Sequence, residues 1–143
     1  MIIGIPKETY PGERRVALVP MVIPTLTKAG FEVIVEANAG SQAGYPDTQY
    51  ADKGAQIVAS RTALFEKADI ILQILCYGSN DVTGREDLSL MRPNQIVIGF
   101  LRPFGSREAV QEIASRGVAS FSTRLKTART RATTSLIEKG LII

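Results

Sequence analysis

The chain has 143 residues, 45% of them hydrophobic and 22% charged, which is the size and composition of one ordinary globular domain. It has no histidine and one cysteine, Cys76, which excludes an internal disulfide, a His-based triad and the usual Cys/His zinc site. No signal-peptide pattern opens the chain, and no apolar run reaches the roughly 20 residues of a membrane span. We therefore expect a cytoplasmic protein with no bound metal and no membrane insertion.

The charge is unevenly distributed along the chain. Residues 1–122 carry 12 basic and 13 acidic side chains, a net charge of −1, whereas residues 123–143 carry 5 basic and 1 acidic, a net charge of +4. This predicts a folded α/β domain over 1–122 and a basic, partly helical C-terminal tail over 123–143, where Ser135 and Glu138 have capping-box spacing. The tail has no aromatic residues among its cations, so nucleic-acid binding is not expected.

The chain begins with an apolar strand over 1–5, which Pro6 ends, and a charged loop follows up to Arg15. Further along, one pattern occurs three times: a helix-like segment ends in a basic residue and a glycine (Gly30, Gly54 or Gly117), and a β-branched or apolar run follows. Glycine suits the left-handed position just beyond a helix end. Each glycine therefore predicts a helix-to-strand joint.

The predicted helices and strands alternate. Helices are expected over 20–29, 47–53, 60–67 and 106–116, and one helical turn is expected over 88–91. The first should start late or be kinked because of Pro24, and the second should have Asp47 as its cap. The helix over 106–116 should point Val110, Ile113 and Ala114 inward. Aliphatic strands are expected over 31–35, 55–58, 69–75, 95–99 and 118–121. The pattern is typical of an open, mostly parallel α/β sheet with helices on both faces, a three-layer flavodoxin-like or Rossmann-like fold. No G-x-G-x-x-G follows a strand, so we predict no dinucleotide-binding domain.

Arginines after two of the strands are candidates for binding an anion. Arg14 and Arg15 follow the first strand, and Arg102 follows the strand over 95–99, at the same sheet edge if the strands are parallel. A surface ion pair with Glu8 or Glu13 is the simpler interpretation for the first two, and a solvated loop residue is the simpler one for Arg102.

Two other residues lie at the end of the strand over 69–75. Gln73 is a candidate polar contact for a substrate, and Cys76 is interpreted as a small packing residue, because the chain offers no base to activate its thiol. No catalytic residue is assigned from the sequence.

Residues 3–8, Ile-Gly-Ile-Pro-Lys-Glu, and 13–20, Glu-Arg-Arg-Val-Ala-Leu-Val-Pro, resemble the opening of the alanine dehydrogenase and pyridine nucleotide transhydrogenase N-terminal domain. The resemblance continues in order through 28–33, 54–55, 68–72 and 100–101 and covers about residues 1–122. It implies that Arg15 contacts a substrate carboxylate. It also places Leu75 and Arg102 where alanine dehydrogenases use a lysine and a histidine.

The chain is therefore more similar to the alpha subunit of proton-translocating NAD(P) transhydrogenase, or to the first component of a divided alpha subunit. That resemblance implies NAD(H) as the cofactor of the full-length family, hydride exchange with NADP(H), and membrane transhydrogenase components as partners. Arg131 matches an arginine of a family loop that approaches the nicotinamide. Because the family's dinucleotide-binding domain is not in this sequence, we expect the chain alone to bind no cofactor and to be inactive.

Two further interpretations stay open. The chain is alternatively a non-catalytic module that binds a small anion through Arg14, Arg15 and Arg102, or that assembles with a partner such as a second copy of itself. A truncated gene, a frameshift, an engineered end and a diverged stand-alone protein each account for the basic tail.

Overall fold

The computed structural model describes residues 1–102 and 106–123. The predicted tail after Thr123 lies outside them, and so do Arg131, Ser135 and Glu138. Six strands alternate with helices in the described part. The strands are β1 (Ile2–Ile5), β2 (Glu32–Glu36), β3 (Gln56–Val58), β4 (Ile70–Leu75), β5 (Ile96–Phe100) and β6 (Ala119–Ser122). The helices are η1 (Pro20–Val22), α1 (Ile23–Lys28), η2 (Ser41–Ala43), α2 (Asp47–Asp52), α3 (Arg61–Lys67), α4 (Gly84–Leu90) and α5 (Arg107–Ser115).

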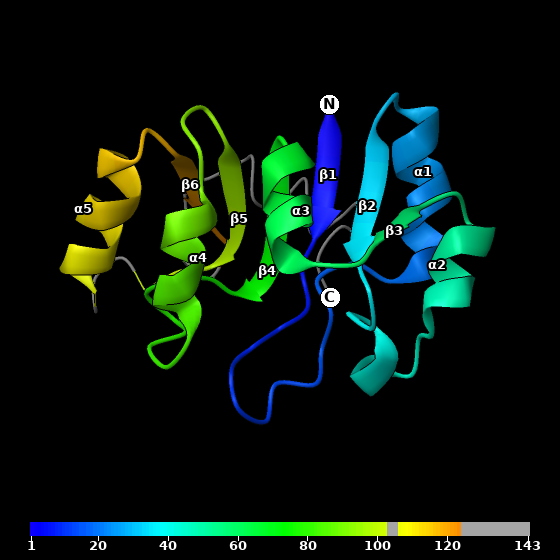
Figure 1. Cartoon of the computed structure of the whole chain (residues 1–143), viewed down its shortest axis with the longest axis horizontal. Helices are drawn as coiled ribbons and strands as arrows, with labels where there is room; N and C mark the ends of the chain where they lie inside the picture. The colour runs from blue at the N-terminus through cyan, green and yellow to red at the C-terminus, as the bar shows by residue number, and fades with distance from the viewer. Residues whose placement is uncertain (103–105, 124–143) are drawn as a thin grey trace.

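The six strands form one parallel sheet in the order β3-β2-β1-β4-β5-β6 (Figure 1). The chain moves outward from β1 to β3, then crosses back to β4 on the other side of β1. The strand order therefore reverses between β1 and β4, and in open α/β sheets ligands bind at the carboxyl ends of the strands at such a switch point.

Helices cover both faces, which confirms the predicted three-layer α/β fold. On one face, Ile23 and Leu26 of α1 and Tyr50 of α2 pack against strand residues that include Ile5 and Val35. The other face carries α3, α4 and α5, whose inward side chains include Leu64, Phe65, Leu88 and Ile113. Successive side chains of a strand pack on opposite faces of the sheet. The strands have near-continuous aliphatic sequences because both faces are buried.

The three predicted helix-to-strand joints are confirmed. Gly30, Gly54 and Gly117 have φ values of +87°, +96° and +71°, in the left-handed region that side chains other than glycine rarely adopt. Pro24 also acts as expected: a 3-10 turn precedes α1, and the α-helix starts only at Ile23.

Several local predictions need correction. The expected turn over 88–91 is the longer helix α4, whose first residue Gly84 packs so close to the Tyr77 Cα that a Cβ would lie 3.1 Å away. The N-cap of α2 is Pro46, and the Asp47 carboxylate instead accepts the Asn38 N–H at 2.9 and 3.0 Å.

The inward face of α5 is also different from the prediction. Ala109 and Ile113, four residues apart, are buried on α5, whereas Ala114 is exposed. Ser106 is the N-cap residue as predicted, although its side chain makes no capping hydrogen bond.

Candidate functional site

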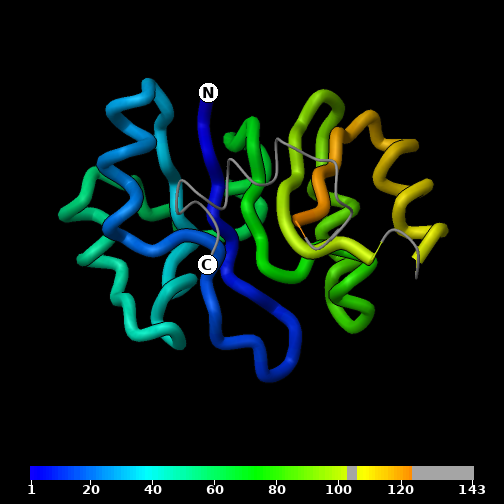
Figure 2. Tube along the Cα trace, turned by 180° about the vertical axis from the view of Figure 1, so that it is seen from behind, coloured from blue at the N-terminus to red at the C-terminus, as the bar shows by residue number. Residues whose placement is uncertain are grey.

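The loop that follows β1 lies at the switch point of the sheet. Residues 6–15 extend beyond the carboxyl ends of the strands and return toward η1, at the lower edge of the molecule in Figures 1 and 2. Pro6 ends β1 early because it cannot donate a ladder hydrogen bond. The neighbouring strand β4 continues to Leu75, so its last N–H groups have no β1 backbone beside them.

The Glu8 side chain takes the place of that missing backbone. Its carboxylate accepts the Ile74 N–H at 2.7 Å and the Leu75 N–H at 3.2 Å, one on each oxygen. Adjacent N–H groups of a regular strand point in opposite directions. Here β4 and β5 change register between Leu72 and Leu75, and the irregularity lets both N–H groups reach one carboxylate.

Burial controls the ionisation of this carboxyl group. Desolvation raises the pKa of Glu8 from 4.5 to about 7, although the two backbone N–H donors and the nearby Arg61 guanidinium act in the opposite direction. The Glu8 carboxyl group therefore titrates close to neutral pH, where an ordinary glutamate is fully ionised.

A buried ion pair between Arg61 and Asp87 lies in the same region as Glu8. Arg61, the first residue of α3, donates Nε to Asp87 Oδ1 at 2.5 Å and Nη2 to Asp87 Oδ2 at 2.7 Å, a two-pronged contact. Asp87 on α4 is only 2% exposed and also accepts the Gln73 Nε2–H at 2.9 Å. The pair thus connects two helices to the middle of β4.

Arg61 also contacts Lys7, the second residue of the loop over 6–15. Its Nη1 donates to the Lys7 carbonyl oxygen at 2.6 Å and to Glu36 Oε2 at 3.2 Å. The same Glu36 oxygen accepts the Lys7 N–H at 2.8 Å. Through these contacts the ends of β1 and β2 and helices α3 and α4 share one polar network.

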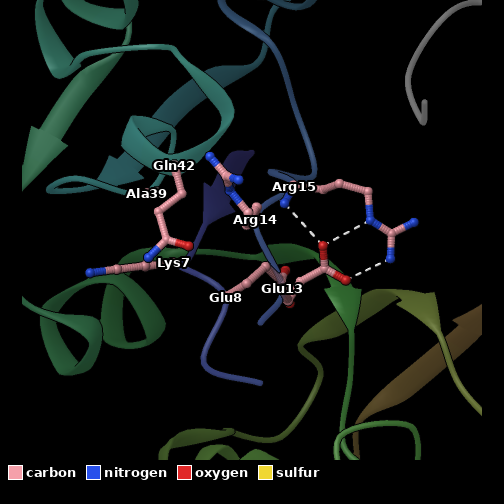
Figure 3. Close-up of a pocket in the computed structure, with 7 residues that line it drawn as sticks. All are labelled: Lys7, Glu8, Glu13, Arg14, Arg15, Ala39 and Gln42. Atoms are coloured by element: carbon pink, nitrogen blue, oxygen red, sulfur yellow. Dashed lines mark hydrogen bonds and ion pairs between the residues drawn. The ribbon is translucent and has the colours of Figure 1, made fainter. Parts of the chain in front are cut away.

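Arg15 lies outside that network. Its side chain, 56% exposed, makes a two-pronged contact with Glu13 at 2.8 and 2.6 Å, and its guanidinium carbon lies 5.9 Å from the centre of the Phe100 ring. Figure 3 shows the Arg15 and Lys7 side chains extending to opposite sides of the loop. The hollow that these residues line with Glu8, Arg14, Ala39 and Gln42 has a volume of about 10 Å³, room for about one water molecule.

Comparison with known proteins identifies the family. Residues 4–138 match the family model described as "Alanine dehydrogenase/PNT, N-terminal domain". The chain belongs to this family. The match begins within β1 and extends past residue 122, so it contains the whole Glu8 loop and the polar network beneath it.

Curated relatives come from both branches of the alanine dehydrogenase/PNT family. The chain is 34% identical over 117 residues to NAD(P) transhydrogenase subunit alpha of Cereibacter sphaeroides, covering 82% of this chain and 21% of that protein. It is 34% identical over 122 residues to alanine dehydrogenase 1 of Staphylococcus aureus, covering 85% of this chain and 31% of that one. The chain thus spans between a fifth and a third of the relatives it matches.

Solved structures show the same similarity. The transhydrogenase from Sinorhizobium meliloti superposes with a TM-score of 0.79 at 32% identity, over 92% of this chain and 37% of that one. An L-alanine dehydrogenase superposes with a TM-score of 0.81 at 27% identity, over 95% of this chain and 36% of that one. The observed sheet is therefore the N-terminal domain fold of the family.

The candidate substrate residues occupy different environments within this family domain. Arg15 is exposed and paired with Glu13, the ion pair that is the simpler interpretation of the sequence. Arg102 is exposed beyond the end of β5, and Gln73 is buried on β4 beneath Asp87. These placements put Arg15 and Arg102 at one sheet edge, as expected of parallel strands, and Gln73 below it.

Cys76 is fully buried next to the end of β4. Burial raises the pKa of its thiol well above the ordinary value, and a protonated, enclosed thiol fits the predicted packing role.

The residues that organise the site are not among those predicted from the sequence. The sequence singles out none of Arg61, Asp87 and Glu36, and for Glu8 a surface ion pair is the simpler interpretation. One signal was available: an acidic residue two places after Pro6, at the end of a central strand, is well placed to accept exposed strand N–H groups. No local pattern pairs Arg61 with Asp87, because 26 residues separate them.

The switch point does not fit a dinucleotide. The strand order is the one in which the turn after β1 usually binds a pyrophosphate on glycine N–H groups. Here that turn carries Pro6, Glu8 and Glu13 in place of the glycine pattern. Among residues 1–102 and 106–123 no group of three metal-ligating side chains occurs, and no helix there is long and apolar enough to cross a membrane.

Proposed function

We propose that this chain is the substrate-side domain of an NAD(P) transhydrogenase alpha subunit of the proton-translocating kind, and that it has no oxidoreductase activity by itself. Family membership and the similarity to the alpha subunit of Cereibacter sphaeroides support the hydride-transfer context. The proposal includes a cytoplasmic location beside the membrane components of such a transhydrogenase.

The observation that carries the proposal is the residue at the end of β4. The resemblance implies a lysine here and a histidine after β5 for alanine dehydrogenase chemistry. This chain has Leu75 and Arg102 at these positions and no histidine in 143 residues. A leucine side chain cannot pair with a substrate carboxylate, and no imidazole is available as a proton donor.

The absence of a dinucleotide site in the described residues supports the inactivity of the isolated chain. Glu8 would repel a pyrophosphate at the switch point, and the first strand is followed by proline and charged residues instead of glycines. In the proposed arrangement NAD(H) is held by another domain, and this domain contributes Arg15 and the sheet edge that faces it.

Two assays test this proposal. Calorimetry with the wild-type chain should give no saturable heat with NADH at micromolar concentrations, and L-alanine with NAD⁺ should yield no NADH. The chain should then be mixed with the dinucleotide-binding components of a transhydrogenase, and hydride transfer from NADH to an NADP⁺ analogue measured. Micromolar NADH binding by the chain alone, or alanine-dependent NADH formation, contradicts the proposal.

An alternative function is a non-catalytic module that binds a small anion or assembles with a copy of itself. The exposed Arg14, Arg15 and Arg102 at one sheet edge favour anion binding. A thermal-shift screen with small carboxylates and phosphates tests it: a ligand should stabilise the wild type and lose its effect in Arg15→Ala. Arg116→Ala, which removes an exposed arginine just after α5 and outside the proposed anion site, is the matched control. Gel filtration at several concentrations tests assembly.

A further inference from the structure

We propose that the end of β4 is a binding seat for a carboxylate, built from the Ile74 and Leu75 N–H groups, which Glu8 fills from within the chain and which a free small monocarboxylate occupies when the Glu8 side chain is absent. This goes beyond the proposed function, because it needs neither a dinucleotide nor a partner domain. Its ligand is a formate- or acetate-sized anion, the part of the Glu8 side chain that makes the contact.

The backbone builds the seat. Two consecutive N–H groups converge where β4 and β5 change register, and β1 has already ended. Gly99 of β5 makes this geometry possible, because a Cβ at that position would lie 2.1 Å from the Gln73 carbonyl oxygen and 2.6 Å from Cys76 Sγ. Converging backbone N–H groups form anion-binding concavities in proteins generally.

Glu8 satisfies the seat with both of its oxygens. The contacts of 2.7 and 3.2 Å use one oxygen for each N–H group, so a free carboxylate could reproduce both. Because both N–H groups already donate to Glu8, no donor of the seat is free for an external anion while Glu8 is in place. Glu8 and a free carboxylate therefore exclude each other.

The seat is coupled to the loop through the rest of the polar network. Arg61 holds the Lys7 carbonyl oxygen next to Glu8, and its charge is shared by Asp87 and Glu36. Displacing Glu8 would remove one of the contacts that position the loop over 6–15, which carries the exposed Arg14 and Arg15, while the contacts of Lys7 with Arg61 and Glu36 remain. Occupancy of the seat is thus a means of changing the position of the cations that the loop presents.

Several charged or titratable groups surround Glu8. They are Arg61 on α3, Asp87 on α4, Glu36 at the end of β2, Glu13 and Arg15 in the same loop, and the Cys76 thiol after β4.

The first test is rescue of Glu8→Ala by sodium formate. We expect the melting temperature of this variant to rise saturably with formate and to exceed its response to sodium chloride at equal ionic strength. The wild type should respond alike to both salts, because the Glu8 carboxylate already accepts both N–H groups of the seat. Equal responses of Glu8→Ala to formate and chloride overturn the proposal.

A second measurement uses variants that keep the core intact. In ¹H–¹⁵N spectra recorded between pH 3 and 9, the Ile74 and Leu75 amide protons should shift with a common midpoint in the wild type and in Glu66→Gln, an exposed control. In Glu8→Gln that titration should disappear. If neither amide proton titrates in the wild type, Glu8 does not occupy the seat in solution. Detection of NADH binding would refute the proposed function and leave both of these results unaffected.

Discussion

The buried pair between Arg61 and Asp87 allows a sharp test of how the site is held together. In Asp87→Ala, the guanidinium loses the contacts of 2.5 and 2.7 Å, and the Gln73 amide loses its acceptor at 2.9 Å. Removing one partner of a buried ion pair costs about 3–5 kcal/mol because the other charge stays buried.

Two details of the structure determine where in that range the loss should fall. The Arg61 side chain is 17% exposed and keeps its contacts with the Lys7 carbonyl oxygen and Glu36, which favours the lower end. The unsatisfied Gln73 amide adds about 1 kcal/mol. We therefore expect a loss of about 4 kcal/mol, most of the stability of a domain at the lower end of the usual range of about 5–15 kcal/mol.

Urea unfolding followed by circular dichroism measures this loss. Arg85→Ala is the matched control, because it removes an ion pair in which the Arg85 side chain is 69% exposed, and it should cost less than about 1 kcal/mol. The double variant Arg61→Met/Asp87→Leu should recover part of the loss, since it removes both charges of the pair and Glu36 keeps the Lys7 N–H. If Asp87→Ala costs no more than Arg85→Ala, the pair is effectively solvated and the reasoning fails.

Three other predictions concern the loop and the strand beneath it. Because the pKa of Glu8 is about 7 in the folded chain and 4.5 as the ordinary value, the folded state holds the extra proton, so the free energy of unfolding should fall as pH rises from 4.5 through 7 and then level off. Chemical denaturation across pH should show this slope in the wild type, and a slope unchanged in Glu8→Gln would contradict it. Gly99→Ala should lower the unfolding free energy by about 2 kcal/mol or more, because its Cβ would meet a β4 carbonyl oxygen 2.1 Å away. Gly30→Ala, with open space around the Cβ, should cost only the backbone strain of about 1 kcal/mol, so equal losses in the two alanine variants would refute the steric argument. Arg15→Ala should change stability by less than about 1 kcal/mol in urea unfolding, because the Arg15 side chain is 56% exposed and Glu13 keeps the Arg15 backbone N–H at 2.9 Å; a larger loss would show that the loop depends on this side chain.

The architecture could be predicted because its signals are local. Runs such as residues 70–75 are aliphatic throughout since both faces of the strand are buried, and the glycines at 30, 54 and 117 mark left-handed turns after helices. These features depend on residues within one turn or one strand. The parallel sheet with helices on both faces follows from their alternation.

The candidate site could be predicted only in part. The position of Arg15 in the loop after β1 follows from the strand before it, but the role of Glu8 depends on where β1 ends relative to β4. No pattern in the sequence marks Asp87 as buried, because its partner Arg61 lies 26 residues away and only folding brings the two together. The sequence predicts only one turn of the helix over Gly84–Leu90. Its buried face consists of Gly84, Asp87 and Leu88, so the apolar pattern of an amphipathic helix is missing.

The central position of β1 has a consequence for how the chain folds. This strand precedes the other five strands in the chain, yet one of its two neighbours, β4, lies almost 70 residues later in the sequence. The contact between Glu8 and Ile74 spans 66 residues. Non-local contacts of this kind form late, because the entropy of closing a long loop is lost before they can compensate for it. During translation β1 therefore lacks this neighbour until β4 has left the ribosome, and β5 and β6 complete the sheet only afterwards.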